Sequence, residues 1–182
     1  MRRRDDTLRD TLLNYARNLA DTDGLDAINI RSLAQRAGVA TGTVYNYFSS
    51  KEEILLALTE EYWKKNLLEL KDAITADSFC GQLEEIFSFL RERIDHSAGK
   101  LMNSLGSVEA AGQERMASMQ SALETILLQG MEQDANVRKD IWKESFTKQQ
   151  FAHFIMMNMM MSLKMRSPDL HFFITIIKHT IY

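Results

Sequence analysis

The sequence predicts an all-α protein. Of its 182 residues, 45% are hydrophobic, whereas only one is Pro and eight are Gly. Apolar residues recur along most of the chain at the three- and four-residue spacing of amphipathic helices. We find no convincing alternation of apolar and polar residues bounded by turn signals, which is the pattern of a half-buried strand. A chain of this length can bury a sizeable core, in one large domain or two small ones.

Three helices are expected near the N-terminus. The first, at about 7–21, has an apolar stripe formed by Leu8, Leu12, Tyr15, Ala16 and Leu19. Two shorter helices are expected at about 30–37 and 41–48. Asn29 precedes the first of these, where its side-chain oxygen can cap free N–H groups. Gly38 follows it, where a left-handed residue commonly ends a helix.

The helix at 41–48 is too short to be stable alone. Val44 and Phe48, four residues apart, can anchor it to the helix before it. The remaining surface then carries uncharged hydroxyl groups suited to phosphates and base edges, from Thr41, Thr43, Tyr45 and Tyr47. Taken singly, each of these residues is more often a turn, cap or packing residue. Their common spacing favours DNA contact, in a helix-turn-helix whose second helix enters a major groove.

A long helix is predicted to open at SSKEEIL, residues 49–55. A Ser there can cap the helix, and Glu52 and Glu53 complement the positive end of its dipole. Apolar spacing predicts further helices at about 77–96, 100–106, 108–133, 147–165 and 169–181, about nine in all. We therefore expect a helix-turn-helix domain at 1–50 and a second helical domain at 51–182.

The segment LAQRAGVATGTVYNYFSSKEEIL, from Leu33 to Leu55, resembles the tetracycline-repressor (TetR) family of bacterial transcription regulators. The string G-V-x-x-G-T-x-Y-x-Y-F-x-x-K is specific, and the detailed similarity covers roughly the first third of the chain. Ile30 departs from the family, in which Ser or Thr often contacts phosphate at this position. The resemblance implies a homodimeric regulator with DNA contacts from Arg31, Thr41, Gly42, Thr43, Tyr45, Tyr47 and Lys51.

The charge is unevenly distributed along the chain. The net charge is −3, but residues 1–51 carry +2 and residues 52–182 carry −5. Arg2, Arg3 and Arg4 form a basic arm, while Arg31 and Lys51 flank the predicted reading helix. Phosphate contacts supply much of the affinity for DNA and its salt dependence. A modest local excess of positive charge suffices when two copies act together, so we expect double-stranded DNA with a palindromic operator as partner.

The last two predicted helices are apolar on more than one face. Phe151, Phe154 and Met161 occupy one side of the first, whereas Met156, Met157 and Met160 occupy much of the rest. Such a helix needs partners on two sides. A two-fold homodimer through both helices would provide them. The alternative is a pair of fully buried core helices in a monomer, for which 182 residues leave little surrounding body.

A small hydrophobic or amphipathic effector is also expected. Its predicted cavity is lined by Tyr62, Phe87, Leu90, Met102, Leu105, Met116, Met119 and Phe154. Methionines make adaptable walls, and ligand pockets are mostly apolar with few polar groups. The same residues lie on apolar helical stripes, however, where core packing is the commoner role.

Other functional classes are disfavoured. The sequence has no nucleophile elbow, phosphate-binding glycine loop, HExxH or CxxC. We therefore expect no enzyme activity, cofactor or metal, although clustered methionines could ligate Cu(I). The single Cys80 fits a reducing cytoplasm, and we expect neither a signal peptide nor a membrane-spanning helix. The predicted function is an effector-responsive transcriptional repressor; a DNA-binding regulator without effector and an activator are the alternatives.

Overall fold

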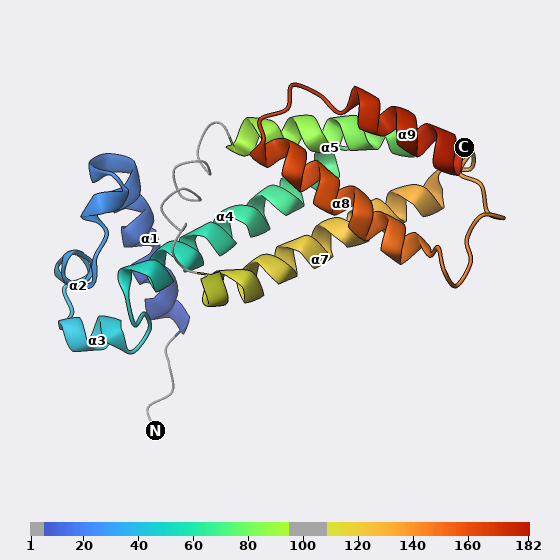
Figure 1. Ribbon diagram of the computed structural model, residues 1–182. Coiled ribbons are helices and arrows are strands. Elements are labelled where there is room, and N and C mark those ends of the chain that lie inside the picture. The colour runs from blue at the N-terminus through green and yellow to red at the C-terminus, as the bar shows by residue number, and fades with distance from the viewer. Residues whose placement is uncertain (1–5, 95–108) are drawn as a thin grey trace. The chain divides into compact units, whose positions relative to one another are not determined.

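The computed structural model describes residues 6–94 and 109–182 (Figure 1). From 109 to 119 it describes the backbone, and residue 117 is the one whose side chain it also describes. Within these residues the chain is helical and contains no strand, which confirms the predicted all-α class. The short helix expected at 100–106 lies outside the described residues. The elements are α1 (Asp6–Asp23), the 3-10 helix η1 (Leu25–Ala27), α2 (Ile30–Ala37), α3 (Thr41–Tyr45), α4 (Lys51–Ala73), α5 (Phe79–Arg93), α7 (Glu109–Gln133), α8 (Lys148–Lys164) and α9 (His171–Ile181).

The described residues form two compact units. The first contains 6–63 and 109–115, and the second contains 64–94 and 116–182. Helix α4 therefore begins in the first unit and ends in the second. Its opening turns contribute Ile54, Leu55 and Leu58 to the same core as α1. The functional division at residue 50 stays a prediction, but the packing of the first unit includes part of α4.

The core of the first unit confirms the apolar stripes expected from the sequence. Leu12 on α1, Leu33 on α2 and Val44 on α3 are fully buried. Because α3 has only five residues, this burial rather than its own backbone bonds holds the helix in place. Fully burying a side chain of this size contributes about 1.5–3 kcal/mol.

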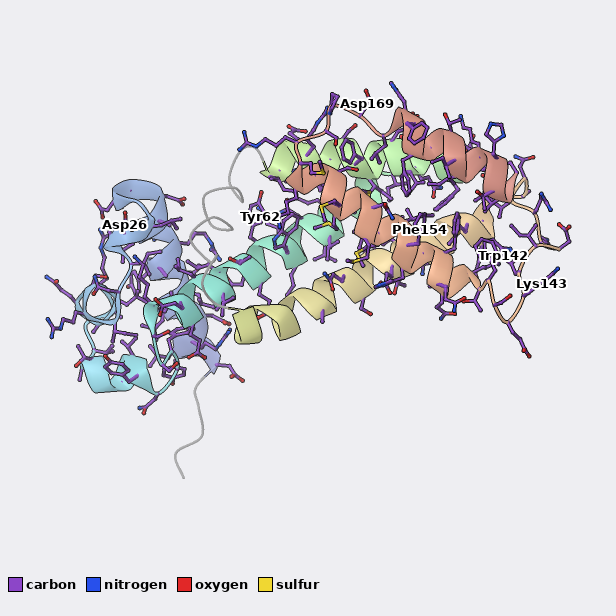
Figure 2. The ribbon with its side chains drawn as sticks, in the orientation of Figure 1. Asp26, Tyr62, Trp142, Lys143, Phe154 and Asp169 are labelled. Atoms are coloured by element: carbon purple, nitrogen blue, oxygen red, sulfur yellow. The ribbon has the colours of Figure 1, made fainter. Side chains whose placement is uncertain are left out.

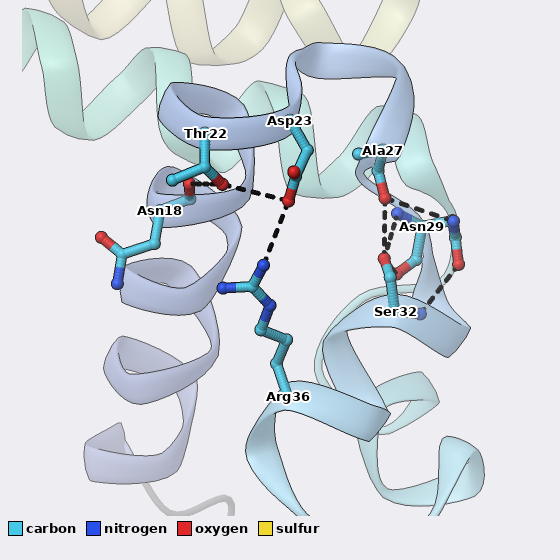
Figure 3. A network of polar contacts seen from close by, with 7 residues as sticks. All are labelled: Asn18, Thr22, Asp23, Ala27, Asn29, Ser32 and Arg36. Carbon is cyan, nitrogen blue, oxygen red and sulfur yellow. Dashed lines mark hydrogen bonds and ion pairs between the residues drawn. The ribbon is translucent and has the colours of Figure 1, made fainter.

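Polar contacts fix the junction between α1 and α2 (Figure 3). Arg36 on α2 donates a hydrogen bond from Nη2 to Oδ2 of Asp23 at the end of α1, over 3.0 Å. The hydroxyl of Thr22 also donates to this carboxylate oxygen. The hydroxyl of Ser32 donates to the carbonyl oxygen of Ala27, over 2.8 Å. These bonds hold α2 in a defined position relative to α1, and α2 in turn supports α3.

Both ends of α2 have the caps that the sequence predicts. Oδ1 of Asn29 accepts the backbone N–H of Ser32, over 2.9 Å, and the hydroxyl of Ser32 accepts the N–H of Asn29. This reciprocal pair satisfies two backbone N–H donors at the start of the helix. Gly38 lies in the left-handed region with φ 65°, which a residue with a Cβ adopts only at a cost. The chain therefore turns sharply from α2 towards α3.

The second unit packs α5 against α8 and α9 (Figure 1). Phe79, Leu83, Ile86, Phe87 and Leu90 form the buried face of α5. Ile155, Met156 and Met159 of α8, with Ile174, Ile177 and Ile181 of α9, are also buried. Helix α9 begins at His171, two residues later than predicted. Oδ1 of Asp169 accepts the N–H of His171, over 3.0 Å, and both Pro168 and Asp169 lie before the helix.

A buried carboxylate ties together three segments of the second unit. Asp134, directly after α7, is 5% exposed. It accepts the N–H of Phe79 at the start of α5, over 2.8 Å, and the N–H of Asn136, over 2.9 Å. The hydroxyl of Tyr182, directly after α9, also donates to it. Burial alone would raise the pKa of Asp134, but these hydrogen bonds outweigh burial and lower the pKa below its ordinary value.

We expect Asp134→Asn to destabilise the second unit by about 1–3 kcal/mol at pH 7, because an amide cannot accept all of these donors. A carboxyl group whose pKa is lower in the folded than in the unfolded chain stabilises the folded state when the pH is above its unfolded pKa, about 3.9. This contribution is lost as the pH falls through the folded pKa. Urea unfolding should therefore show a large difference in the free energy of unfolding between wild type and variant at pH 7. The difference should be smaller at pH 3. If this difference were the same at pH 3 as at pH 7, the result would contradict a stabilising role for the ionised carboxylate of Asp134.

Candidate DNA-binding interface

The two motif helices are held together by buried residues of α3 and the turn after it. Val44 is fully buried and Phe48 is 1% exposed. The backbone N–H of Val39 donates to the carbonyl oxygen of Ala34, over 3.0 Å, which closes the connection from α2. The guanidinium of Arg9 lies over the Phe48 ring, 5.7 Å from its centroid. The predicted anchoring by Val44 and Phe48 is confirmed.

The opposite side of α3 presents uncharged polar groups to solvent. Thr41 and Gly42 are exposed, Thr43 is half-buried, and Tyr45 is 58% exposed. Helix α3 ends at Tyr45 rather than near Phe48. The N–H groups of Tyr47 and Phe48 both donate to the carbonyl oxygen of Val44, over 2.9 and 3.0 Å, so Tyr47 lies on a turn after the helix.

Two basic side chains lie in sequence on either side of this surface. Arg31 is exposed in the first turn of α2, and no polar partner for its side chain occurs among the described residues. Lys51 is the first residue of α4, and its Nζ lies 3.5 Å from Oδ1 of the fully exposed Asp26. An exposed pair of this kind contributes about 0–1 kcal/mol, so a phosphate can replace Asp26 at little cost.

The start of α4 is capped beside Lys51. The hydroxyl of Ser50 accepts the N–H of Glu53, over 3.3 Å, and Oε2 of Glu53 accepts the N–H of Ser49, over 2.6 Å. The predicted capping by this Ser pair is therefore confirmed for Ser50. Helix N-termini favour anions, which makes this end of α4 compatible with a phosphate contact.

Ile30, which departs from the family pattern, is a core residue. It is 8% exposed and belongs to the hydrophobic cluster of the first unit. A side chain in this position packs against the core instead of reaching a phosphate. The missing hydroxyl is thus replaced by apolar packing at the start of α2.

The residues predicted to line an effector cavity have different surroundings. Phe87 and Leu90 are each 3% exposed in the core of the second unit. The Tyr62 ring contacts the Trp63 ring edge-on, with centroids 5.7 Å apart. Phe154 is 46% exposed on α8 and contacts Phe173. Met102 and Leu105 lie outside the described residues, and the side chains of Met116 and Met119 are not described.

The part of the chain that the structure describes lacks the features of a membrane span and of a metal site. No helix there has both the length and the apolar character needed to cross a bilayer. Among the same residues, no group of three or more His, Cys, Asp or Glu side chains is arranged to hold a metal ion. Cys80 is buried, and burial raises the pKa of its thiol above the ordinary value.

Sequence comparisons match the N-terminal region to a known family. Residues 12–58 match the profile of "Bacterial regulatory proteins, tetR family". The transcriptional repressor KstR of Rhodococcus jostii (strain RHA1) is 42% identical over 55 residues, which cover 30% of this chain and 26% of KstR. The uncharacterised transcriptional regulator YvdT of Bacillus subtilis (strain 168) is 33% identical over 66 residues, which cover 36% of this chain and 34% of YvdT. The chain thus spans about a quarter to a third of the length of these relatives.

Solved structures share the fold over nearly the whole chain. RolR without ligand superposes with a TM-score of 0.64 at 19% identity, covering 94% of this chain and 89% of RolR. The reduced form of Escherichia coli NemR superposes with a TM-score of 0.59 at 15% identity, covering 96% and 97%. These identities establish a common fold only. Together with the match at 12–58 and the repressor relatives, they support a regulator of the TetR family of bacterial regulatory proteins.

Proposed function

We propose that the protein is a transcriptional repressor that binds a palindromic operator as a homodimer and is released by a small hydrophobic or amphipathic effector. The observation that carries this proposal is the outer face of α3. Thr41 and Tyr45 are exposed there, whereas Val44 and Phe48 hold α3 against the core. A five-residue helix with its polar side free is suited to insertion into a major groove.

The proposed division of labour separates base reading from phosphate binding. Thr43 and Tyr45 would contact base edges or thymine methyl groups, because their side chains combine a hydroxyl with an apolar part. Arg31 and Lys51 would contact the phosphate backbone and fix the position of α3 on the duplex. Phosphate contacts would then set the salt dependence, and α3 would set the preference for sequence.

An exposed apolar stripe on α8 and α9 supports the homodimer. Phe154, Met157 and Met161 recur at helical spacing on α8 and Met165 continues the spacing directly after it; the four are 46–73% exposed. Phe172 and Ile176 lie one turn apart on α9 and are 79% and 41% exposed. Large apolar side chains left exposed in this number are typical of an interaction surface in soluble proteins. A second copy of the chain would cover the stripe through its own α8 and α9, as in an isologous interface.

Release by an effector would act through α4, which continues from the first unit into the second. Two reading helices of a dimer must lie roughly 34–36 Å apart to enter successive major grooves. An effector that prefers a different tilt of α4 would change this separation. A shift from mostly bound to mostly released requires about 5.5 kcal/mol of differential binding, which two effector molecules can share.

A DNA titration at several salt concentrations tests the proposal. The purified protein should bind duplexes from the promoter region of its own gene with nanomolar affinity and two chains per site. With Arg31 and Lys51 from both subunits on phosphates, the logarithm of affinity should fall with the logarithm of salt with a slope of at least about −3.6. Equal affinity for the promoter fragment and an unrelated duplex of the same length would exclude an operator-specific regulator.

A regulator without effector remains the second candidate, because Phe87 and Leu90 are fully packed in the core. A thermal-shift screen separates the two. A hydrophobic compound that raises the melting temperature and lowers operator affinity supports the effector-responsive form. Stabilisation by none of a broad set of compounds favours the form in which the second domain only dimerises.

A further inference from the structure

A pocket in the second unit is lined by residues from three segments. Arg91 and Ile94 come from the end of α5, Leu163 from the last turn of α8, and Arg166, Ser167 and Pro168 from the connection to α9. Its volume is about 440 Å³, within the range of small-molecule sites. Figure 2 marks Asp169, the residue that follows Pro168 in this connection. Of the residues predicted to line the effector cavity, the four whose side chains the structure describes, Tyr62, Phe87, Leu90 and Phe154, do not line this pocket.

The charges around the pocket favour an anion. Among the residues that the structure describes, two guanidinium groups line it and no carboxylate does. The neighbouring acid, Asp169, is engaged at the start of α9, where it accepts the N–H of His171 and pairs with its ring. Helices α5 and α8 both end here, and each C-terminus carries about half a negative charge. The two full positive charges of Arg91 and Arg166 exceed the two half negative charges of the helix ends. Neutralising the helix C-termini therefore does not by itself explain why two arginines lie here.

The two arginines differ in how far they are already engaged. Arg91 donates one hydrogen bond from Nη1 to the carbonyl oxygen of Pro168 and lies over the Phe87 ring, 5.7 Å from its centroid. Its guanidinium retains further donors, because the group carries five N–H bonds. For the side chain of Arg166, no ion pair or hydrogen bond occurs among the described residues.

The backbone of Arg166 is also unusual. It is the one described non-glycine residue with a positive φ, 54°. The N–H of Ser167 donates to the carbonyl oxygen of Ser162, over 2.9 Å, and the N–H of Arg166 to that of Leu163, over 3.1 Å. This is the helix ending in which glycine usually occupies the left-handed position. An arginine there accepts backbone strain and brings a guanidinium to the pocket.

From this arrangement we infer that the pocket binds a small amphipathic carboxylate, with its head between Arg91 and Arg166. A guanidinium holds a carboxylate through two parallel N–H bonds, which an ammonium cannot do. The hydroxyl of Ser167 provides a further donor. Ile94, Leu163 and Pro168 form an apolar wall for a short hydrocarbon tail. The ligand would connect the end of α5 with the α8–α9 connection, and its binding does not depend on whether the protein binds DNA.

Calorimetric titration of the full chain without DNA tests this site with three probes of equal tail length: octanoate, octan-1-ol and octylamine. Octanoate should bind saturably with one site per chain, whereas the alcohol and the amine should bind at least tenfold more weakly. Arg166→Gln should raise the Kd for octanoate at least tenfold, and Arg166→Lys should retain part of the affinity. Lys164→Gln removes the same charge two residues earlier, outside the pocket, and should leave the Kd unchanged.

Arg166→Gly separates binding from folding, because glycine accepts the positive φ. This variant should have a melting temperature about 2–4 °C higher than wild type and should lose octanoate binding. Any one of three results overturns the inference: no octanoate binding by wild type, equal binding of octanoate and octanol, or equal effects of Arg166→Gln and Lys164→Gln. A parallel operator titration keeps the two proposals distinct, since DNA binding can persist when octanoate binding fails.

Discussion

The double substitution Tyr45→Ala, Lys51→Ala is expected to abolish operator-specific binding while leaving the fold intact. A base contact of the kind expected for Tyr45 and a phosphate contact from Lys51 each contribute about 1–3 kcal/mol. Both changes occur twice in a dimer, so affinity should fall at least a hundredfold. Electrophoretic mobility shift and fluorescence anisotropy with the promoter duplex would measure the loss.

The structure indicates why stability should survive this change. Tyr45 is 58% exposed and lies outside the core that Val44 and Phe48 fill. Lys51 forms one weak exposed pair with Asp26. Lys71→Ala is the matched control, because it removes an exposed charge from the second-unit part of α4. The control should bind DNA within twofold of wild type. Wild-type affinity in the double variant would show that α3 and the start of α4 are not the reading surface.

The second large effect is expected from placing charge in the apolar stripe of α8 and α9. Met161→Glu with Phe172→Glu introduces four carboxylates into a two-fold interface, where unpaired charges are costly to bury. We expect the particle mass to fall from about twice 21.0 kDa to that of a single chain. Operator affinity should fall with it, because each half-site would then bind independently. Analytical ultracentrifugation measures the first effect and anisotropy the second.

Both substituted side chains are more than half exposed in the single chain, at 54% and 79%, so the subunit itself should keep its fold. Gln149→Glu is the control: it adds one exposed carboxylate in the first turn of α8, away from the stripe. This variant should remain dimeric. A wild type that is already monomeric at micromolar concentration, or a charged variant that still dimerises, would refute the proposed interface.

The helix-turn-helix was predictable because its determinants are local in sequence. The Asn29 cap and the left-handed Gly38 depend on neighbours within about four residues, and the four-residue spacing of Val44 and Phe48 marks one buried side even though their burial is completed by α1 and α4. The early end of α3 was missed because apolar spacing locates Phe48 on the buried side without saying whether the backbone is still helical there.

Features of the second unit depend on pairs far apart in the chain, which spacing cannot reveal. Asp134 forms hydrogen bonds with residues 55 and 48 positions away in the sequence. Arg91 donates a hydrogen bond to the carbonyl oxygen of Pro168, 77 residues later in the sequence. Both residues line the pocket. A Phe or Leu on an apolar stripe looks the same in sequence whether it fills the core or lines a cavity. The predicted effector lining therefore stays a prediction.

The central claim is that paired copies of α3 read an inverted repeat, and selection of bound duplexes from a random-sequence pool tests it most directly. We predict enrichment of an inverted repeat whose half-site centres are about one helical turn apart, 10–10.5 base pairs, or a multiple of that distance. The Tyr45→Ala, Lys51→Ala variant should enrich nothing. Enrichment of an unrepeated site, or no enrichment by the wild-type protein at low salt, would contradict the claim.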